Sequence, residues 1–182
     1  MNKEKINETI KKSISDQDLE RYFNKSIYKK IISFGDLRKY TSIDKFLPKP
    51  KDFIILLIET SKNVGHWVCL TKNHDTITFF DSYGYFPGDE LKFVDADKRV
   101  QLHEDHNYLL DLIKQSRYKF DYNNIKYQSF KTNVNDCGRW VILYLILFNE
   151  KDITLKGFHQ FITQKTKQLK LSNDQLVSYL IE

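Results

Sequence analysis

The amino-acid sequence predicts an α+β fold in which a central, mostly antiparallel sheet packs against a buried helix, with helices on both sides. Segments with strand character gather in one central block, residues 53–81. Helical patterns occupy the chain before and after that block, and this grouping is typical of α+β proteins. The longest apolar run, Trp140 to Phe148, has nine residues, which is under half of a membrane span. We therefore expect one domain over residues 1–182, with no membrane association.

The first elements are helical and the central ones are strands. Ser15 or Asp16 can cap a helix, and Leu19, Phe23, Ile27 and Ile31 follow at helical spacing. Residues 1–14 are expected to form a flexible N-terminal extension. Strands are predicted at 53–59, 66–72 and 76–81, with a short one near 124–130. Later helices are predicted at 104–115, 137–149, 157–168 and 173–181.

Composition narrows the classes of function. The net charge of +5 and the isoelectric point of about 9.0 allow an acidic partner or DNA as a polyanion, although basicity alone is weak evidence. Two cysteines, Cys69 and Cys137, cannot form a disulfide framework. The charged N-terminal sequence MNKEKINETIKK does not resemble a signal peptide, so an intracellular setting is expected rather than secretion.

His66 and Asp81 form the first candidate catalytic pair. If the two central strands form a hairpin about Asn73 and His74, paired residue numbers sum to 147, which places His66 opposite Asp81 on one face. A carboxylate there fixes the imidazole tautomer and stabilises the imidazolium, as a histidine general base requires. The alternative is a strand-end histidine beside solvent, with Asp81 capping the turn of the DSYG sequence.

Cys137 is the candidate nucleophile. Asn135 or Asp136 can cap the following helix, so the thiol would lie in its first turn, where the helix dipole favours a thiolate. A cysteine at such a position more often serves packing, and that alternative stays open. Cys69 lies three residues after His66 and faces the other side of its strand, so we expect it in the core.

Two further residues could complete a site around Cys137. Gln128, nine residues earlier, could donate a hydrogen bond to an oxyanion together with the backbone N–H of Cys137. Gly138 lacks a side chain at a point where a substrate backbone would have to approach closely. A loop glutamine by itself is usually just solvated, so the prediction depends on the whole set of residues.

Three segments resemble a known family. GHWVCL, FFDSYG and QSFKTNVNDCGRWV are similar to the signature blocks of adenain-like and Ulp-type cysteine proteases, and the resemblance covers about residues 15–150. It implies a papain-like or adenain-like fold. It further implies His66 as general base, Asp81 as its orienting acid, Cys137 as nucleophile and Gln128 as oxyanion donor, with Trp67 and Gly138 at the substrate site. The usual interval from glutamine to cysteine is six or seven residues rather than nine, so Asn133 and Asn135 remain alternative donors.

The CGRWV variant and the short chain look most like the capsid-maturation proteases of virophages, Polinton-type elements and large DNA viruses. This resemblance implies a cysteine endopeptidase that cleaves viral capsid or precursor proteins after Gly-Gly or Gly-X, in the virion and the infected-cell interior. A deconjugating protease for a ubiquitin-like modifier of the SUMO type is the alternative, and an inactive relative that serves as a binding module is a third reading.

No cofactor is expected to be required, although related proteases use a polyanion or a peptide as activator. His103 and His106 stand at i, i+3 on a predicted helix, a spacing that can hold a metal ion. No third ligand stands nearby in the sequence, so we expect no metal site.

Overall fold

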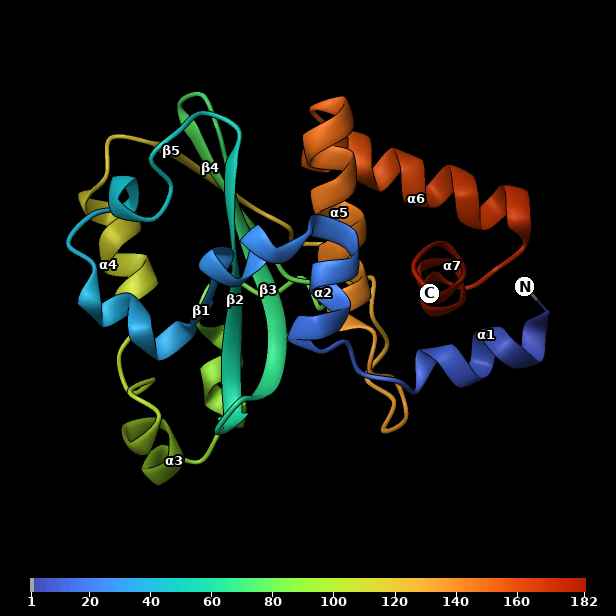
Figure 1. Ribbon diagram of the computed structural model, residues 1–182, viewed down its shortest axis with the longest axis horizontal. Helices are drawn as coiled ribbons and strands as arrows, with labels where there is room; N and C mark the ends of the chain where they lie inside the picture. The colour runs from blue at the N-terminus through green and yellow to red at the C-terminus, as the bar shows by residue number, and fades with distance from the viewer. Residues whose placement is uncertain (1) are drawn as a thin grey trace.

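The computed structural model describes residues 2–182 and contains a five-stranded sheet with helices on both faces (Figure 1). The strands lie in chain order: β1 (Ile31–Ser33), β2 (Asp52–Ser61), β3 (Val64–Asn73), β4 (Thr76–Phe80) and β5 (Lys119–Tyr122). β2, β3 and β4 are antiparallel, and β1 and β5 add parallel pairings at the two edges. The α+β class predicted from the sequence is confirmed.

Seven α-helices and four short 3-10 helices complete the described residues. The α-helices are α1 (Lys3–Ile10), α2 (Asp16–Phe23), α3 (Ala96–Gln101), α4 (Tyr108–Gln115), α5 (Cys137–Lys151), α6 (Leu155–Leu169) and α7 (Asn173–Leu180). The 3-10 helices are η1 (Lys25–Lys30), η2 (Phe34–Lys39), η3 (Ile43–Lys45) and η4 (Asp89–Phe93). In Figure 1, α5, α6 and α7 lie on one side of the sheet and α4 on the other.

Alternating side chains of the central strands build two hydrophobic cores. On β2, Ile55 and Leu57 join the core with α5, α6 and α7, whereas Ile54, Leu56 and Ile58 join the core with α4 and η2. This alternation follows from the two-residue period of a strand. α5 is buried along most of its length, as its continuous apolar sequence predicted, so it forms a fixed support for the residues at its N-terminus.

Three predicted elements need correction. The short strand predicted near 124–130 is wrong: the strand is β5, and in that loop the Tyr127 and Gln128 amides both donate to the Ser82 carbonyl. The helix predicted from residue 104 begins at Tyr108, where the Asn107 side chain caps it. The expectation of a flexible extension over residues 1–14 is wrong for residues 2–14, because α1 packs against α7 with Ile6 buried.

Neither a metal cluster nor a membrane helix is present in the described part of the chain. His103 has φ +59° in a turn, and His106 contacts Asp111, so the expected helical pair of histidines does not form. Residues 2–182 contain no group of three or more metal-ligating side chains. None of the helices described above is long and apolar enough to span a bilayer.

The aromatic centre of the larger core provides a test of the fold. The Phe80 ring stacks on Tyr144 with centroids 4.4 Å apart and meets Phe158 edge-on at 5.3 Å. We predict that Phe80→Ala lowers the free energy of unfolding by about 3–5 kcal/mol, because it leaves a cavity in a packed aromatic cluster. Denaturant titration measures this change.

Phe93→Ala is the matched control, since Phe93 is 66% exposed and should alter the free energy of unfolding by about 0.5 kcal/mol or less. Equal losses in the two variants would contradict the packing described here.

Candidate active site

The hairpin of β3 and β4 sets the relation between His66 and Asp81. Paired residues, such as Cys69 and Phe80, have numbers that sum to 149 rather than the expected 147, because the turn falls on His74 and Asp75, with φ +51° at His74. The expected direct opposition of His66 and Asp81 is therefore wrong. A shift of two residues preserves the face on which a side chain lies, so His66 and Asp81 still share one face of the hairpin.

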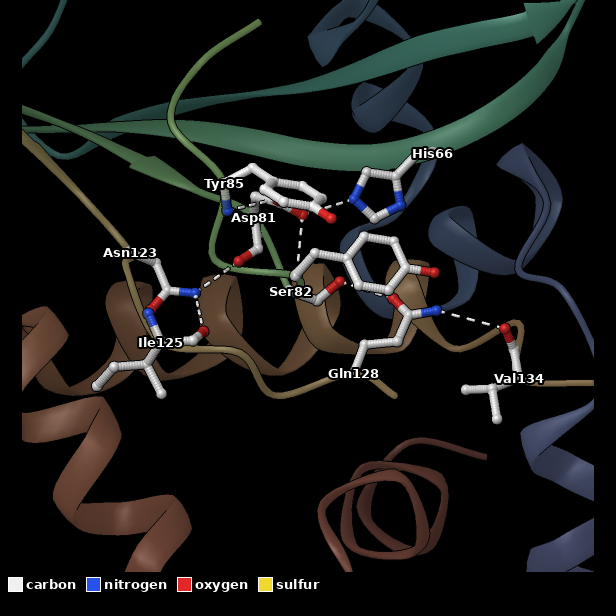
Figure 2. A network of polar contacts seen from close by, with 9 residues as sticks. His66, Asp81, Ser82, Tyr85, Asn123, Ile125, Gln128 and Val134 are labelled. Atoms are coloured by element: carbon white, nitrogen blue, oxygen red, sulfur yellow. Dashed lines mark hydrogen bonds and ion pairs between the residues drawn. The ribbon is translucent and has the colours of Figure 1, made fainter. Parts of the chain in front are cut away.

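The His66 and Asp81 side chains are in contact, with Nε2 of His66 2.6 Å from Oδ1 of Asp81 (Figure 2). Asp81 directly follows the end of β4 and is fully buried. The backbone N–H groups of Tyr83 and Tyr85 each donate to its carboxylate at 3.0 Å. Burial alone would raise the pKa of Asp81, but the His66 charge and these three hydrogen bonds lower it. The Asp81 carboxylate therefore accepts the N–H groups of the turn that follows it and also pairs with His66.

Cys137 is the first residue of α5, as predicted, and its thiol lies beside the imidazole of His66. Burial by itself would raise the pKa of the thiol. The hydrogen bond and charge of His66, with the N–H groups of Trp67 and Gly138, outweigh burial and lower that pKa. Burial would likewise lower the pKa of His66, but Asp81 and then Cys137 raise it well above its usual value. These opposite shifts favour a thiolate–imidazolium pair.

Cys69 provides an internal comparison. It is fully buried in the core against α5, as predicted, and burial alone raises the pKa of its thiol well above the usual value. The pKa values of the two cysteine thiols are therefore shifted in opposite directions.

Gln128 lies in the same cavity as His66 and Cys137, and only 2% of its surface is exposed. The Ser82 hydroxyl donates to Oε1 of Gln128 at 2.7 Å, which fixes the orientation of the amide (Figure 2). Nε2 donates to the Val134 carbonyl at 3.4 Å, and an amide nitrogen has a second N–H to offer. This geometry suits an oxyanion donor.

The two alternative donors are placed less favourably. Asn133 is exposed and is not among the residues that line the cavity. Asn135 lines the cavity, but its Nδ2 donates to the Lys11 carbonyl at 2.8 Å. The longer interval to Cys137 is taken up by a turn, in which the Val134 N–H donates to the Lys131 carbonyl.

Residues 10–15, which we call the N-terminal strap, run across the start of α5 and were not predicted to contribute to the site. Four donors from the site each reach the carbonyl of a different strap residue. Asn135 donates its backbone N–H to Ile10 and its side chain to Lys11, Arg139 donates to Lys12, and the Trp67 indole donates to Ile14 at 3.0 Å. Arg139 also donates to the Ile181 carbonyl. The strap therefore fixes both β3 and α5 next to the catalytic candidates.

Gly138 takes part in this packing. A Cβ atom added at Gly138 would lie 2.5 Å from Cβ of Ile14, so the missing side chain makes room for the strap. The contact of Gly138 with substrate stays a prediction. Trp67 does line the cavity, as predicted, while its indole N–H holds the strap.

The cavity of about 1270 Å³ contains two further features that sequence reasoning missed. The Tyr83 ring stacks on the imidazole of His66 at 4.8 Å, with Phe130 on its other face at 4.5 Å. Glu90 is a buried carboxyl on the cavity wall. In the sequence, the aromatic residues of the turn after Asp81 could have indicated that Tyr83 lies at the site. The acidic FPGDEL segment could have indicated the same for Glu90.

The strap contact gives a prediction for stability. Gly138→Ala should lower the free energy of unfolding by about 1–3 kcal/mol, because the added methyl group overlaps Ile14. Gly157→Ala in α6 is the matched control and should change the free energy of unfolding by about 1 kcal/mol or less, since its nearest atom, Cγ1 of Ile153 at 3.1 Å, has to move by only a few tenths of an ångström. Urea titration of both variants measures the difference, and equal effects would contradict the role given to the strap.

The pKa shifts give a prediction for thiol reactivity. An ordinary thiol of pKa about 8.5 is roughly 1% ionised at pH 6.5, whereas the lowered pKa of Cys137 keeps more of its thiolate at that pH. We expect iodoacetamide to alkylate Cys137 at pH 6.5 at least about tenfold faster than it does in His66→Ala, because that variant loses the imidazolium partner. Peptide mapping by mass spectrometry measures the rate.

His159→Ala, which alters an exposed histidine on α6, should alkylate like the wild type. A rate at Cys137 no faster than at Cys69 would contradict the ion pair.

Comparison with solved structures finds likeness at low identity. The C-terminal Ulp1 protease domain in complex with Smt3, the yeast ortholog of SUMO, has a TM-score of 0.40 and 18% identity, over 94% of this chain and 77% of that one. The ASFV pS273R protease has a TM-score of 0.45 and 16% identity, over 95% of this chain and 64% of that one. ChlaDub1 from Chlamydia trachomatis has a TM-score of 0.32 and 10% identity, over 87% and 82%. Because all three TM-scores are below 0.5, these structural likenesses say nothing about the chemistry of this chain.

Sequence comparison gives a firmer relation. No family model matches the chain. Over 163 residues the chain is 34% identical to uncharacterized protein V9 of Sputnik virophage. The aligned region covers 89% of this chain and 89% of V9. The chain therefore belongs to the same protein family as V9 of Sputnik virophage.

Proposed function

We propose that this protein is a cysteine endopeptidase that cleaves viral capsid or precursor proteins during virion maturation. The observation that carries the proposal is the contact of His66 with Asp81 at 2.6 Å, next to a thiol whose pKa His66 lowers. A histidine held by a carboxylate and facing a cysteine at a helix start is the arrangement that activates a thiol nucleophile. The family relation to a virophage protein supports a viral substrate and an infected-cell or virion setting.

The geometry suggests the following reaction. His66 uses Nε2 for Asp81, which leaves Nδ1 to hold the proton taken from Cys137. The thiolate attacks the scissile carbonyl carbon, and the oxyanion accepts hydrogen bonds from the Cys137 N–H and the Gln128 amide. His66 then donates its proton to the leaving amine, which gives a thioester. Water, deprotonated by His66, attacks the thioester and releases the carboxylic acid and the free thiol.

The backbone N–H of Cys137 is suited to this task by its position. It lies in the first turn of α5, where no preceding helical carbonyl is available to accept from it. The positive end of the helix dipole favours both the thiolate and the oxyanion at this place.

Small residues before the scissile bond are part of the proposal. Trp67 lines the cavity beside Cys137, and the Tyr83–Phe130 stack forms another part of its wall. An extended chain with few side chains, such as Gly-Gly or Gly-X, fits most readily between such aromatic walls. A polyanion or peptide activator stays a prediction, to be tested by adding DNA or capsid peptides to the same assay.

The direct test is cleavage of candidate substrates. We expect the wild type to cleave virophage capsid or precursor proteins, with new termini after small residues that mass spectrometry maps. Cys137→Ala should lose all cleavage, since it removes the thiol beside His66, while Cys69→Ala should retain it, since Cys69 is buried in the core.

Fusions ending in ubiquitin-like modifiers belong in the same assay. Cleavage of these fusions and not of viral proteins would favour the deconjugating alternative. Cleavage that persists in Cys137→Ala would contradict the proposed chemistry altogether.

A further inference from the structure

A second buried carboxyl, that of Glu90, lies beside the His66–Asp81 pair. Glu90 is on η4, lines the same cavity as His66 and Cys137, and is 6% exposed. Within residues 2–182, neither of its side-chain oxygens has a hydrogen-bond partner. Asp81 is the charged group with the largest effect on the pKa of the Glu90 carboxyl, a side-chain contact between the two carboxyls adds to that effect, and the charge of His66 acts in the opposite direction. Burying an ionised carboxylate without a cation or a hydrogen-bond donor costs much free energy. The Glu90 carboxyl is therefore expected to avoid the ionised form.

The backbone around Glu90 is built to hold it there. Gly88 precedes η4 with φ +87°, and a Cβ at Gly88 would lie 2.2 Å from Nδ2 of Asn107. The same Asn107 amide donates to the Pro87 carbonyl at 2.8 Å, while its Oδ1 caps α4. This anchored turn fixes the start of η4, so the position of Glu90 beside Asp81 does not depend on the side chain alone.

The acceptor sites of Asp81 leave room for one more donor. A carboxylate offers about four lone-pair sites. Oδ1 accepts from Nε2 of His66 and from the Tyr83 N–H, and Oδ2 accepts only from the Tyr85 N–H. One site on Oδ2 therefore remains, and a protonated carboxyl is a donor that can fill it.

We propose that Glu90 is a positioning residue whose protonated carboxyl donates a hydrogen bond to Oδ2 of Asp81 and thereby holds the Asp81 carboxylate against His66. Two carboxyls in contact in a buried site cannot both ionise cheaply, so one of them keeps its proton. Asp81 accepts hydrogen bonds from three donors and takes the charge, whereas the donor that acts on the Glu90 carboxyl is its own backbone N–H, so Glu90 takes the proton. The inference rests on the proposed role of His66 and Cys137, which Glu90 supports through its contact with Asp81.

The surroundings of Glu90 agree with this division. Burial, and then the Asp81 carboxylate, raise the pKa of Glu90 to about 8, with His66 acting in the opposite direction. Tyr85 is a further ionisable group near Glu90, and it also feels the charges of Asp81 and Asp89. The Lys92 ammonium lies 5.5 Å from the centre of the Tyr85 ring. The folded protein therefore keeps the Glu90 proton up to about pH 8 and releases it above that pH.

The test compares Glu90→Gln, which keeps an N–H donor, with Glu90→Leu, which removes it. Iodoacetamide alkylation of Cys137 is measured from acid to alkaline pH. At pH 6.5 we expect Glu90→Gln to react within about twofold of wild type, and Glu90→Leu to react about tenfold more slowly, the size expected for losing one hydrogen bond to a charged group. Above pH 8 wild type should fall below Glu90→Gln, because only wild type acquires a second buried charge beside Asp81.

Glu104→Gln is the matched control. Glu104 is also buried, and burial raises its pKa to about 7, but its Oε1 accepts from the Glu59 N–H and it does not line the cavity. Its pH profile should superimpose on that of wild type.

The inference is overturned if Glu90→Gln and wild type superimpose at all pH values, or if Glu90→Gln is as slow as Glu90→Leu at pH 6.5. The first comparison needs no Glu90→Leu protein, so it stands even where that variant does not fold. Alkylation measures the reactivity of Cys137 without a peptide substrate. If His66→Ala slows the alkylation of Cys137 but the Glu90 substitutions do not, this inference is refuted and the proposed function is not. A wild-type Cys137 with ordinary reactivity refutes the proposed function as well.

Discussion

The contact between Nε2 of His66 and Oδ1 of Asp81 is the interaction on which the rest of the site depends. Both groups are removed from water, and burial alone would drive each of them toward its neutral form. Their mutual charge and the N–H groups of the turn after Asp81 reverse that tendency. An imidazole that stays charged can then hold the thiol of Cys137 as a thiolate, although burial opposes that charge too.

Residues far apart in the chain converge to hold this arrangement. His66 belongs to β3, Cys137 begins α5, and the N-terminal strap crosses between them and takes hydrogen bonds from both elements. In Figure 1 the first and last helices, α1 and α7, lie beside one another on the same side of the sheet as α5. Loosening the strap would therefore move the helix that carries the thiol relative to the strand that carries the imidazole.

Local sequence patterns predicted the parts of the fold that local chemistry determines. The apolar run after Cys137 gave a buried helix with the right start, and strand alternation placed His66 and Asp81 on one face. The sum of paired residue numbers was wrong by two because the turn falls on His74 and Asp75 rather than on Asn73 and His74, and the local sequence suits a turn at either position. Glu90 was missed because its significance comes from a tertiary contact with Asp81, which no spacing in the sequence specifies.

The measurement that tests the central claim most directly is a titration of the Cys137 thiolate by its ultraviolet absorbance, taken as the difference between wild type and Cys137→Ala. The account predicts that the thiolate signal persists well below the usual thiol pKa and that Asp81→Asn moves its loss to higher pH, because His66 then holds its proton less tightly. A signal that disappears near pH 8.5, as for an ordinary thiol, and does not respond to Asp81→Asn would contradict it.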